Sequence, residues 1–352
     1  MNLDVKKIAF IKLGKFLEQF SNTEIVKNNE VSHNDEFFST FEGLMHQAVH
    51  HNGWFTLPEV TIAVKSWADA LTKENIDTWT KAYDFNKEPL QKIGLILAGN
   101  IPLVGFHDFL CVLLSGNIAV IKLSSNDQKL LPTLANYLIT IEPQFKDRIV
   151  FVKEKLEGFD AVIATGSNNT ARYFDYYFSN VPNIIRKNRN SVAVLNGAES
   201  HDDLVALGKD VFTYYGLGCR NVSKLFVPRD YNFDAFYQGM FEYKEVIEYE
   251  KYSNNYDYNK AVFLMSEFKI LDNGFLTIKE DKTYASPISS VFYEFYDTLE
   301  EVKERLQIDS EKIQCIVSND LVEGSVRFGQ TQTPQLWDYA DNVDTLEFLL
   351  NL

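Results

Sequence analysis

Residues 93–125, IGLILAGNIPLVGFHDFLCVLLSGNIAVIKLSS, alternate short apolar runs with one stretch of helical periodicity. The runs at 93–98 and 118–123 predict buried strands, and the apolar positions within 103–114 predict a helix between them. Strands rich in valine, isoleucine and leucine that alternate with helices are typical of a parallel sheet covered on both faces. We therefore predict an α/β fold. The same alternation predicts further strands at 149–152, 160–164 and 191–195 and further helices at 129–141 and 170–178.

The chain has 352 residues, which is long for a single domain, so we expect two domains. Residues 1–90 predict mostly helices, and the first is an amphipathic helix within 1–20 that no signal-peptide cleavage site follows. No uninterrupted apolar run approaches the roughly 18 residues that a membrane-spanning helix needs. We predict a soluble protein without membrane insertion.

The net charge indicates which partners the protein can bind, and the cysteine content indicates its redox compartment. Thirty-four basic and forty-nine acidic side chains give a net charge of −15, which repels phosphate backbones, so we predict no nucleic-acid partner. Three widely spaced cysteines cannot form a disulfide framework or a cysteine-rich zinc site. His46 and His50 share a helix face but lack a third ligand, so we predict no metal site. A reducing cytoplasm fits this composition.

Polar residues follow three of the predicted strands at the point where each strand ends. They are Gly99 to Pro102, Lys122 to Ser125, and Thr165 to Asn169. The carboxyl ends of parallel strands form the ligand crevice of such a sheet, and glycines, hydroxyls and amides there suit a cofactor phosphate or ribose. Ordinary turn chemistry explains any single turn as well. The GxGxxG dinucleotide fingerprint is absent, because the nearest string, at 216–221, lacks the third glycine and follows a predicted helix.

Cys219 is the candidate nucleophile of the sequence. It follows Gly216-Leu217-Gly218, between a predicted helix at 203–214 and a predicted strand at 222–227, and such a turn leaves a thiol open. Arg220 beside it favours the thiolate. Cys111 and Cys315 lie within apolar runs and are expected in the core. The alternative is that Cys219 is a small buried residue at a helix–strand junction.

His107 is a second residue with two interpretations. It follows Asn100 in the first of the three turns, where it could contact a ligand. The simpler alternative is a histidine on a helix whose hydrogen bonds are satisfied within the protein.

Four motifs occur in a fixed order: Gly-Asn-Ile-Pro (99–102), Ser-Gly-Asn-Ile-Ala-Val-Ile-Lys (115–122), Thr-Gly-Ser-Asn-Asn-Thr-Ala-Arg (165–172) and Gly-Leu-Gly-Cys (216–219). In these motifs the chain resembles the aldehyde dehydrogenase superfamily, and most closely its acyl-CoA reductase branch, typified by the fatty-acid reductase of bacterial bioluminescence (Lux). The segment Asn52 to Thr56 and the tail from Arg327 to Asp338 are also similar to that branch.

The resemblance implies the fold, the domain limits and the assembly. It implies two parallel-sheet α/β domains, one Rossmann-like for the cofactor and one catalytic, with a helical N-terminal region. The NADP-binding domain would cover residues 1–189 and the catalytic domain 190–329, and a tail at 330–352 would return to the first domain. It also implies a homo-oligomer.

The resemblance further implies site residues. Cys219 matches the nucleophile, and Asn100 matches the amide that holds the oxyanion together with the backbone N–H of Cys219. Lys122 matches the residue that contacts the adenosine ribose, and Gly166 and Ser167 match the turn beside the cofactor pyrophosphate.

The turn after Lys122 bears on the choice of cofactor. Ser124 and Ser125 follow in this segment, and Ser125 stands where oxidising members carry an acid. The missing negative charge permits a 2′-phosphate, so we expect NADP(H).

The residues that depart from the family pattern point to a reductase. Oxidising members carry a glutamate that activates water, and Arg186 occupies the matching position here. Without that base a thioacyl enzyme survives to meet a hydride, so the resemblance implies NADPH-dependent reduction of a fatty acyl-CoA to its aldehyde. The basic cluster at 186–190 could also meet phosphates, or be a solvated turn.

Three alternatives stay open. The first is a CoA-acylating aldehyde dehydrogenase that runs in the oxidative direction. The second is a reductase that receives its acyl group from a partner acyl-protein synthetase. The third is an inactive acyl-binding scaffold.

Overall fold

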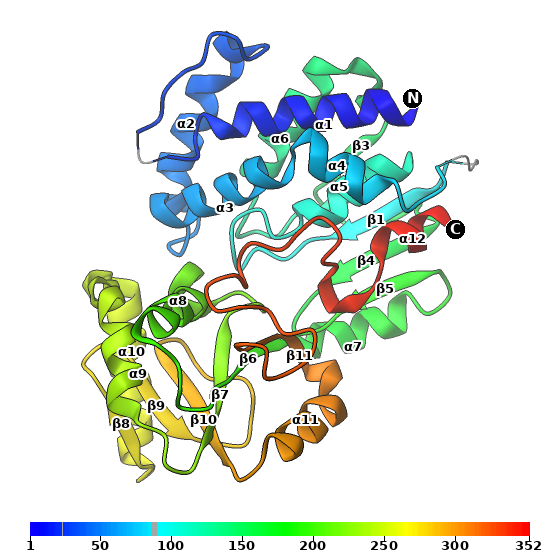
Figure 1. Cartoon of the computed structure of the whole chain (residues 1–352). Coiled ribbons are helices and arrows are strands. Elements are labelled where there is room, and N and C mark those ends of the chain that lie inside the picture. The colour runs from blue at the N-terminus through cyan, green and yellow to red at the C-terminus, as the bar shows by residue number, and fades with distance from the viewer. Residues whose placement is uncertain (23, 86–89) are drawn as a thin grey trace. The chain divides into compact units, whose positions relative to one another are not determined.

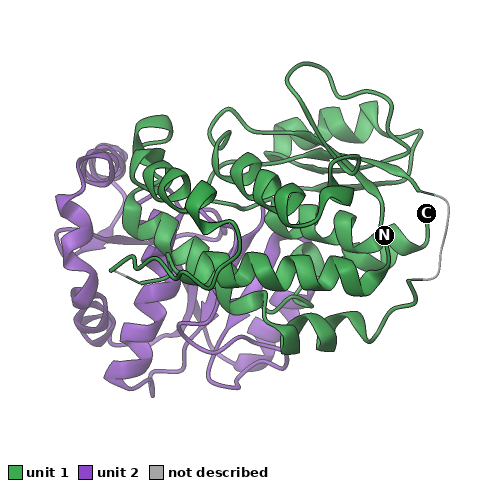
Figure 2. Cartoon of the chain, turned by 90° about the horizontal axis from the view of Figure 1, so that it is seen from above, with its two compact units in different colours: residues 1–187, 335–352 green, residues 188–334 purple. Residues whose placement is uncertain are grey.

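A computed structural model describes residues 1–22, 24–85 and 90–352, so residues 23 and 86–89 of the predicted helical region lie outside the described part. The chain divides into two compact units, coloured separately in Figure 2. Unit 1 contains Met1–Lys187 and Gln335–Leu352, and unit 2 contains Asn188–Pro334. The sequence placed the corresponding boundaries after residues 189 and 329. The cofactor and catalytic roles assigned to these parts stay predictions.

Unit 1 opens with a helical layer built from amphipathic sequence. The side chain of Asn2 caps the first helix by accepting a hydrogen bond from the backbone N–H of Val5. Phe16 and Phe20 of this region are fully buried, and Phe16 stacks on Tyr137, with ring centroids 4.3 Å apart. The helices are α1 (Leu3–Glu18), α2 (Asn34–His51), α3 (Leu57–Ala70) and α4 (Lys73–Thr80).

A five-stranded sheet follows, and all its strands are parallel (Figure 1). The spatial order is β3-β2-β1-β4-β5. The chain adds β2 and β3 on one side of β1 and then β4 and β5 on the other, so the strand order reverses at the boundary between β1 and β4. Helices cover both faces, which confirms the predicted α/β fold of this unit. The elements are β1 (Lys92–Ile96), α5 (Phe106–Ser115), β2 (Ile118–Lys122), α6 (Leu130–Ile141), β3 (Ile149–Val152), β4 (Ala161–Thr165), α7 (Asn168–Tyr177) and β5 (Asn183–Arg186).

Unit 2 contains a six-stranded sheet of order β11-β6-β7-β10-β9-β8. This confirms the expected second α/β domain with a mostly parallel sheet, in which only the edge strand β8 runs antiparallel, to β9. Only four residues join these two strands, with Gly274 at a φ of +93°, and so short a connection permits only a hairpin. The elements are β6 (Asn190–Val194), α8 (His201–Phe212), β7 (Val222–Pro228), α9 (Phe233–Met240), α10 (Glu250–Met265), β8 (Ile270–Asp272), β9 (Thr277–Glu280), β10 (Ser290–Tyr296), α11 (Leu299–Ile308) and β11 (Ile313–Val317).

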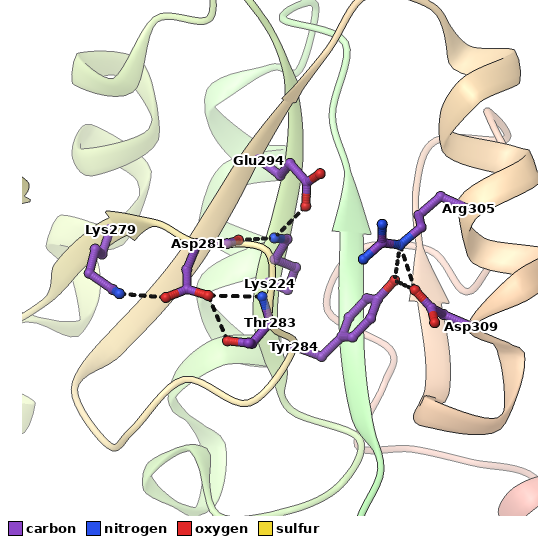
Figure 3. Close-up of polar contacts among 8 residues, drawn as sticks. All are labelled: Lys224, Lys279, Asp281, Thr283, Tyr284, Glu294, Arg305 and Asp309. Carbon is purple, nitrogen blue, oxygen red and sulfur yellow. Dashed lines mark hydrogen bonds and ion pairs between the residues drawn. The ribbon is translucent and has the colours of Figure 1, made fainter.

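A network of ion pairs links the strands of unit 2 to one another (Figure 3). The ammonium of Lys224 on β7 is buried and bonds to the Glu294 carboxylate of β10 at 2.9 Å and to the backbone carbonyl of Asp281. The Asp281 carboxylate in turn accepts from Lys279 on β9. Each of these lysines pairs with a carboxylate. We therefore interpret the cluster as a structural ion-pair network.

The C-terminal segment belongs to unit 1, where α12 (Thr345–Leu350) packs on α5. The hydroxyl of Tyr339 accepts a hydrogen bond from the indole N–H of Trp79 at 2.7 Å and lies 2.7 Å from the hydroxyl of Tyr83. Tyr83 donates to the carboxylate of Asp344 at 2.6 Å. Among the described residues, no helix has both the length and the apolar character needed to cross a membrane.

Candidate active site

The turn that carries Cys219 connects α8 to β7 in unit 2. Cys219 is exposed, whereas Cys111 and Cys315 are buried, as the surrounding sequence predicted. The cysteine that the motifs single out is therefore the one that solvent reaches. Burial raises the pKa of the Cys111 thiol well above its usual range, so that thiol stays protonated and unreactive.

The backbone before Cys219 follows an unusual path. Tyr214, Tyr215 and Gly216 have φ angles of 54°, 55° and 76°, so three consecutive residues adopt the left-handed conformation. Bulky side chains rarely adopt this conformation, and such strain persists only where the surroundings enforce it. The ring of Tyr215 stacks on Tyr249, with centroids 5.0 Å apart, and Tyr214 is buried. The segment just before the cysteine, Tyr214 to Gly216, thus reverses the chain direction in a conformation that the surrounding side chains hold in place.

Asn221 holds the cysteine turn from inside, and sequence reasoning did not single it out. Its side-chain amide donates to the backbone carbonyls of Asp210 and Thr213 at 2.9 and 2.8 Å. Its side-chain oxygen accepts from the N–H of Gly218 at 2.8 Å. Asn221 is 2% exposed, so these bonds form away from water.

Ser191, at the start of β6, holds the other side of the turn. Its hydroxyl donates to the carbonyl of Cys219 at 3.0 Å and accepts from the N–H of Cys315 at 3.1 Å. Ser191 is fully buried. No pattern in the sequence predicted that Ser191 bonds to the cysteine turn, and only the structure shows it.

A strap at Gly329 to Thr331 packs beside the same turn. The buried carboxylate of Asp210 accepts from the N–H groups of Gly329 and Thr331 at 2.7 and 3.0 Å, and from the Thr331 hydroxyl at 2.8 Å. The guanidinium of Arg220 donates to the Thr331 carbonyl. Burial raises the pKa of Asp210, which its three hydrogen bonds oppose. The strap lies within the tail motif that resembled the reductase branch.

The turn that carries Asn100 lies in unit 1, after β1. Asn100 is exposed, and the carbonyl of the preceding Gly99 accepts from the buried side chain of Asn52 at 3.2 Å. Further along, Leu103 has a φ of 56°, and its N–H donates to the carboxylate of Asp127 at 3.1 Å. Burial raises the pKa of Asp127 to about 6. Asn52 and Asp127 thus fix the ends of this turn, and sequence reasoning assigned that role to neither of them.

The predicted cofactor residues lie at the carboxyl edge of the sheet in unit 1. Lys122 ends β2 and is half-buried, and Ser125 beyond it is exposed. Ser124 meets Gly99 so closely that a Cβ on the glycine would come within 2.7 Å of the serine hydroxyl oxygen. The β1 and β2 turns therefore touch only because residue 99 is glycine.

Gly166 and Ser167 follow β4, on the other side of the reversal in strand order. The hydroxyl of Ser167 caps α7 by accepting from the N–H of Thr170 at 3.3 Å. A helix N-terminus with hydroxyls at the switch point of a parallel sheet suits a dinucleotide phosphate. The residues present fit the predicted cofactor, and their individual roles stay predictions.

Arg186 does not belong to an open basic cluster. It is buried on β5, and its guanidinium pairs with the Asp108 carboxylate at 2.7 Å. It also donates to the carbonyl of Ala340 at 2.8 Å and to the hydroxyl of Thr345 at 2.9 Å. The idea that Arg186 meets a cofactor phosphate is therefore wrong, because its donors already bind the tail of unit 1.

His107 is likewise bonded within unit 1, where it is half-buried. Its Nε2 lies 2.8 Å from the carbonyl of Leu336, and its ring stacks on Trp79, with centroids 5.6 Å apart. Burial lowers the pKa of this histidine. The interpretation of His107 as a ligand contact is not supported, and the interpretation as a satisfied histidine on a helix holds.

The two proposed catalytic residues lie in different units, Asn100 in unit 1 and Cys219 in unit 2. Their joint action on one carbonyl stays a prediction. Within the described ranges, no group of three or more histidine, cysteine, aspartate or glutamate side chains could hold a metal ion.

One family model matches part of the chain, and several solved structures are similar in fold. Residues 72–237 match the family model of acyl-CoA reductase (LuxC). No curated protein sequence matches the chain.

Among solved structures, acetylating aldehyde dehydrogenase from Geobacillus thermoglucosidasius is similar, with a TM-score of 0.65 and 12% identity over 96% of this chain and 86% of that one. Aldehyde dehydrogenase 21 from Physcomitrella patens, solved with succinate, gives 0.64 and 12% over 99% and 87%. The P. syringae indole-3-acetaldehyde dehydrogenase AldA, a mutant form solved with NAD+, gives 0.59 and 16% over 90% and 72%.

Proposed function

Because this chain has the aldehyde dehydrogenase fold and carries a LuxC-like acyl-CoA reductase segment at residues 72–237, we propose that it reduces acyl-CoA thioesters to aldehydes with NADPH. The observation that carries the proposal is the difference in solvent exposure among the three cysteines. Cys219 is exposed on a turn held by buried hydrogen bonds, and the other two cysteines are buried. An accessible sulfur on a rigid turn is what covalent catalysis by a thiol requires.

The first half of the reaction is acyl transfer. The thiolate of Cys219 attacks the thioester carbonyl and forms a carbon–sulfur bond, and the carbonyl oxygen becomes an oxyanion. The side-chain amide of Asn100 and the backbone N–H of Cys219 stabilise that oxyanion. The bond to CoA then breaks, CoA leaves as its thiolate and takes a proton from water, and a thioacyl enzyme remains.

The second half is reduction of the thioacyl group. Lys122, Ser124, Ser125, Gly166 and Ser167 would hold NADPH, which supplies a hydride when bound. After reduction, the carbon–sulfur bond of the thiohemiacetal on Cys219 breaks, the hydroxyl proton goes to solvent, and the aldehyde leaves. The Cys219 thiolate is regenerated for the next turnover. Ser125 carries no charge that would repel a 2′-phosphate, which supports NADPH over NADH.

Hydrolysis of the thioacyl enzyme is the reaction that must be avoided. Arg186 stands at the position where oxidising relatives carry their water-activating glutamate. A guanidinium remains protonated and cannot act as a base, and here it is bonded to Asp108 and to the tail. The acyl group on Cys219 would therefore persist until it is reduced.

The resemblance extends the proposal to substrate and setting. We propose a fatty acyl substrate, delivered either as its CoA ester or by an acyl-protein synthetase partner, in a cytoplasmic homo-oligomer. Labelling of Cys219 by acyl-CoA without any added partner would favour direct delivery.

Intact-mass analysis tests the proposal most directly. The chain is incubated with acyl-CoA esters of several lengths, with and without NADPH. We expect one acyl adduct per chain, lost when NADPH is added with release of aldehyde. Cys219→Ser should lose the adduct completely, and Cys315→Ser, which alters a buried cysteine, should keep it.

Two results would contradict the proposal. An adduct that survives in Cys219→Ser would place the chemistry elsewhere, and a wild-type chain that forms no adduct with any ester would favour the acyl-binding scaffold. The oxidative alternative has support from the similarity to an acetylating aldehyde dehydrogenase. Faster turnover with NADP+, aldehyde and CoA than with NADPH and acyl-CoA would favour it.

A further inference from the structure

Three consecutive peptide groups around Cys219 are held by hydrogen bonds from two buried residues, Asn221 and Ser191. The Leu217–Gly218 peptide donates its N–H to the side-chain oxygen of Asn221 at 2.8 Å. The Gly218–Cys219 peptide accepts at its carbonyl from the backbone N–H of Asn221 at 3.0 Å. The Cys219–Arg220 peptide accepts at its carbonyl from the hydroxyl of Ser191 at 3.0 Å. Both peptides that flank the Cα of Cys219 are therefore fixed.

Fixing these peptides fixes the direction of the Cys219 N–H. A trans peptide is planar, with its N–H and C=O pointing to opposite sides. The carbonyl of Gly218 points at the N–H of Asn221, so the N–H of Cys219, in the same plane, points the opposite way. That N–H is the backbone donor that the proposed mechanism aims at the oxyanion.

Asn221 is also anchored at its other end. Its amide donates to the carbonyls of Asp210 and Thr213, at the C-terminus of α8 and just beyond it. The left-handed run at Tyr214 to Gly216 lies between these anchors and the cysteine. One side chain therefore spans the strained reversal and ties the end of a helix directly to the turn. Only a side chain with both a donor and an acceptor can bind the carbonyls and the Gly218 N–H together.

We propose that Asn221 and Ser191 are positioning residues, which aim the Cys219 N–H at the oxyanion and fix the direction of the Cys219 side chain. This inference rests on the proposed acyl transfer. Neither residue reacts with substrate. The backbone N–H of Asn221 fixes the Gly218–Cys219 peptide, and its side chain holds the peptide before it. Ser191 prevents the following peptide from rotating.

Two reactions of the same sulfur separate positioning from simple loss of structure. Acylation by acyl-CoA develops an oxyanion and needs the aimed N–H. Alkylation by iodoacetamide displaces iodide from a saturated carbon and forms no oxyanion. The ratio of the acylation rate to the alkylation rate of Cys219 therefore reports the aim of the N–H, whereas a loss of folded protein lowers both rates together.

The experiment measures both rates by intact mass on the full-length chain. Loss of one oxyanion donor typically costs on the order of 10²–10³ in rate. Asn221→Ala keeps that donor and its own backbone N–H but removes the side-chain bonds that hold the turn around them. We therefore expect the variant to lower the ratio by less than a full loss of the donor, about tenfold. Ser191→Ala should lower it by a smaller factor, and Ser191→Thr, which keeps the hydroxyl, should restore it.

Matched controls exist in both units. Asn183 donates its amide to the carbonyls of Phe178 and Val181 at 3.0 and 2.9 Å, and Ser223 donates its hydroxyl to the Tyr284 carbonyl at 2.7 Å. Asn183→Ala and Ser223→Ala remove bonds of the same kind that do not involve the peptides of the cysteine turn, so they should leave the ratio unchanged.

The outcomes distinguish the two proposals. An unchanged ratio in Asn221→Ala and Ser191→Ala, with a wild-type chain that is acylated, would overturn the positioning role alone. A wild-type chain that iodoacetamide alkylates but no acyl-CoA acylates would overturn the proposed function and the positioning role with it. If Asn221→Ala does not fold, as thermal melting would show, the Ser191→Ala and Ser191→Thr pair decides the matter.

Discussion

The turn of Asn100 in unit 1 and the turn of Cys219 in unit 2 are both fixed by buried side chains, but the groups that fix them differ in charge. An ionisable carboxylate, Asp127, bonds directly to the backbone of the first turn. Neutral groups, the amide of Asn221 and the hydroxyl of Ser191, bond to the second, and the nearby buried carboxylate of Asp210 binds the strap instead. The comparison teaches that pH can act directly on a hydrogen bond that fixes the Asn100 turn, whereas the side chains that bond to the Cys219 turn do not titrate.

The largest effect is expected at the Asn100 side chain itself. Asn100→Ala removes one of two proposed oxyanion donors, which should lower kcat/KM for thioester reduction on the order of 10²–10³-fold while the chain stays folded. Alkylation of Cys219 by iodoacetamide should continue at the wild-type rate. Steady-state kinetics and melting curves test this prediction, and normal turnover by the variant would remove Asn100 from the mechanism.

Asp127 tests the difference in charge between the two turns. Its folded pKa of about 6 lies above the ordinary value of 3.8, so the folded state binds more protons between these pH values. Stability should therefore fall as pH rises through this window, by up to about 3 kcal/mol once the carboxyl is fully ionised. Asp127→Asn stays neutral at every pH, and its melting temperature should lack this dependence.

Melting curves of both chains from pH 4 to pH 8 measure the effect. As pH rises, the melting temperature of the wild type should fall relative to that of Asp127→Asn. Asn221→Asp offers the reverse comparison, since it introduces a carboxylate beside the carbonyls that Asn221 now binds, and it should make the cysteine turn sensitive to pH. Parallel pH profiles for the wild type and Asp127→Asn would contradict the role of this carboxyl.

The smallest effect is expected at Asn52. Its amide donates to the Gly99 carbonyl, and Asn52→Ala removes that bond without touching Asn100. A net hydrogen bond contributes about 1 kcal/mol, which corresponds to roughly a fivefold loss in the acylation rate. Acylation kinetics at Cys219 measure it, with Asn75→Ala as a control that removes amide bonds to backbone carbonyls in the same unit. Equal rates for the two variants would show that Asn52 does not position the turn.

Much of the fold followed from local patterns in the sequence. The strand at 118–123 was predicted within one residue, because a run of branched apolar residues between a glycine and two serines has few other interpretations. β5 was missed, since Asn183–Arg186 is only four residues long and follows a proline. The antiparallel β8 was missed for a similar reason, as three residues of strand give no periodicity.

The site was predictable only where its chemistry is local. The glycines beside Cys219 predict an accessible thiol, and Cys219 is exposed in the structure. Asn52 acts on a residue 47 positions away, and Arg186 meets Asp108 across 78 positions. No spacing rule reaches that far, so an arginine that looked like part of a basic surface turned out to be a buried partner.

The arrangement of the chain has a consequence for how the protein is made. Unit 2 is inserted into unit 1, so all of residues 188–334 are synthesised before the segment that completes unit 1. Until Thr345 and its neighbours arrive, Asp108 and Arg186 lack part of the bonding that encloses them. Unit 2 can therefore fold on the nascent chain before unit 1 is complete. Unit 1 stays incompletely packed until its last helix, α12, has been synthesised.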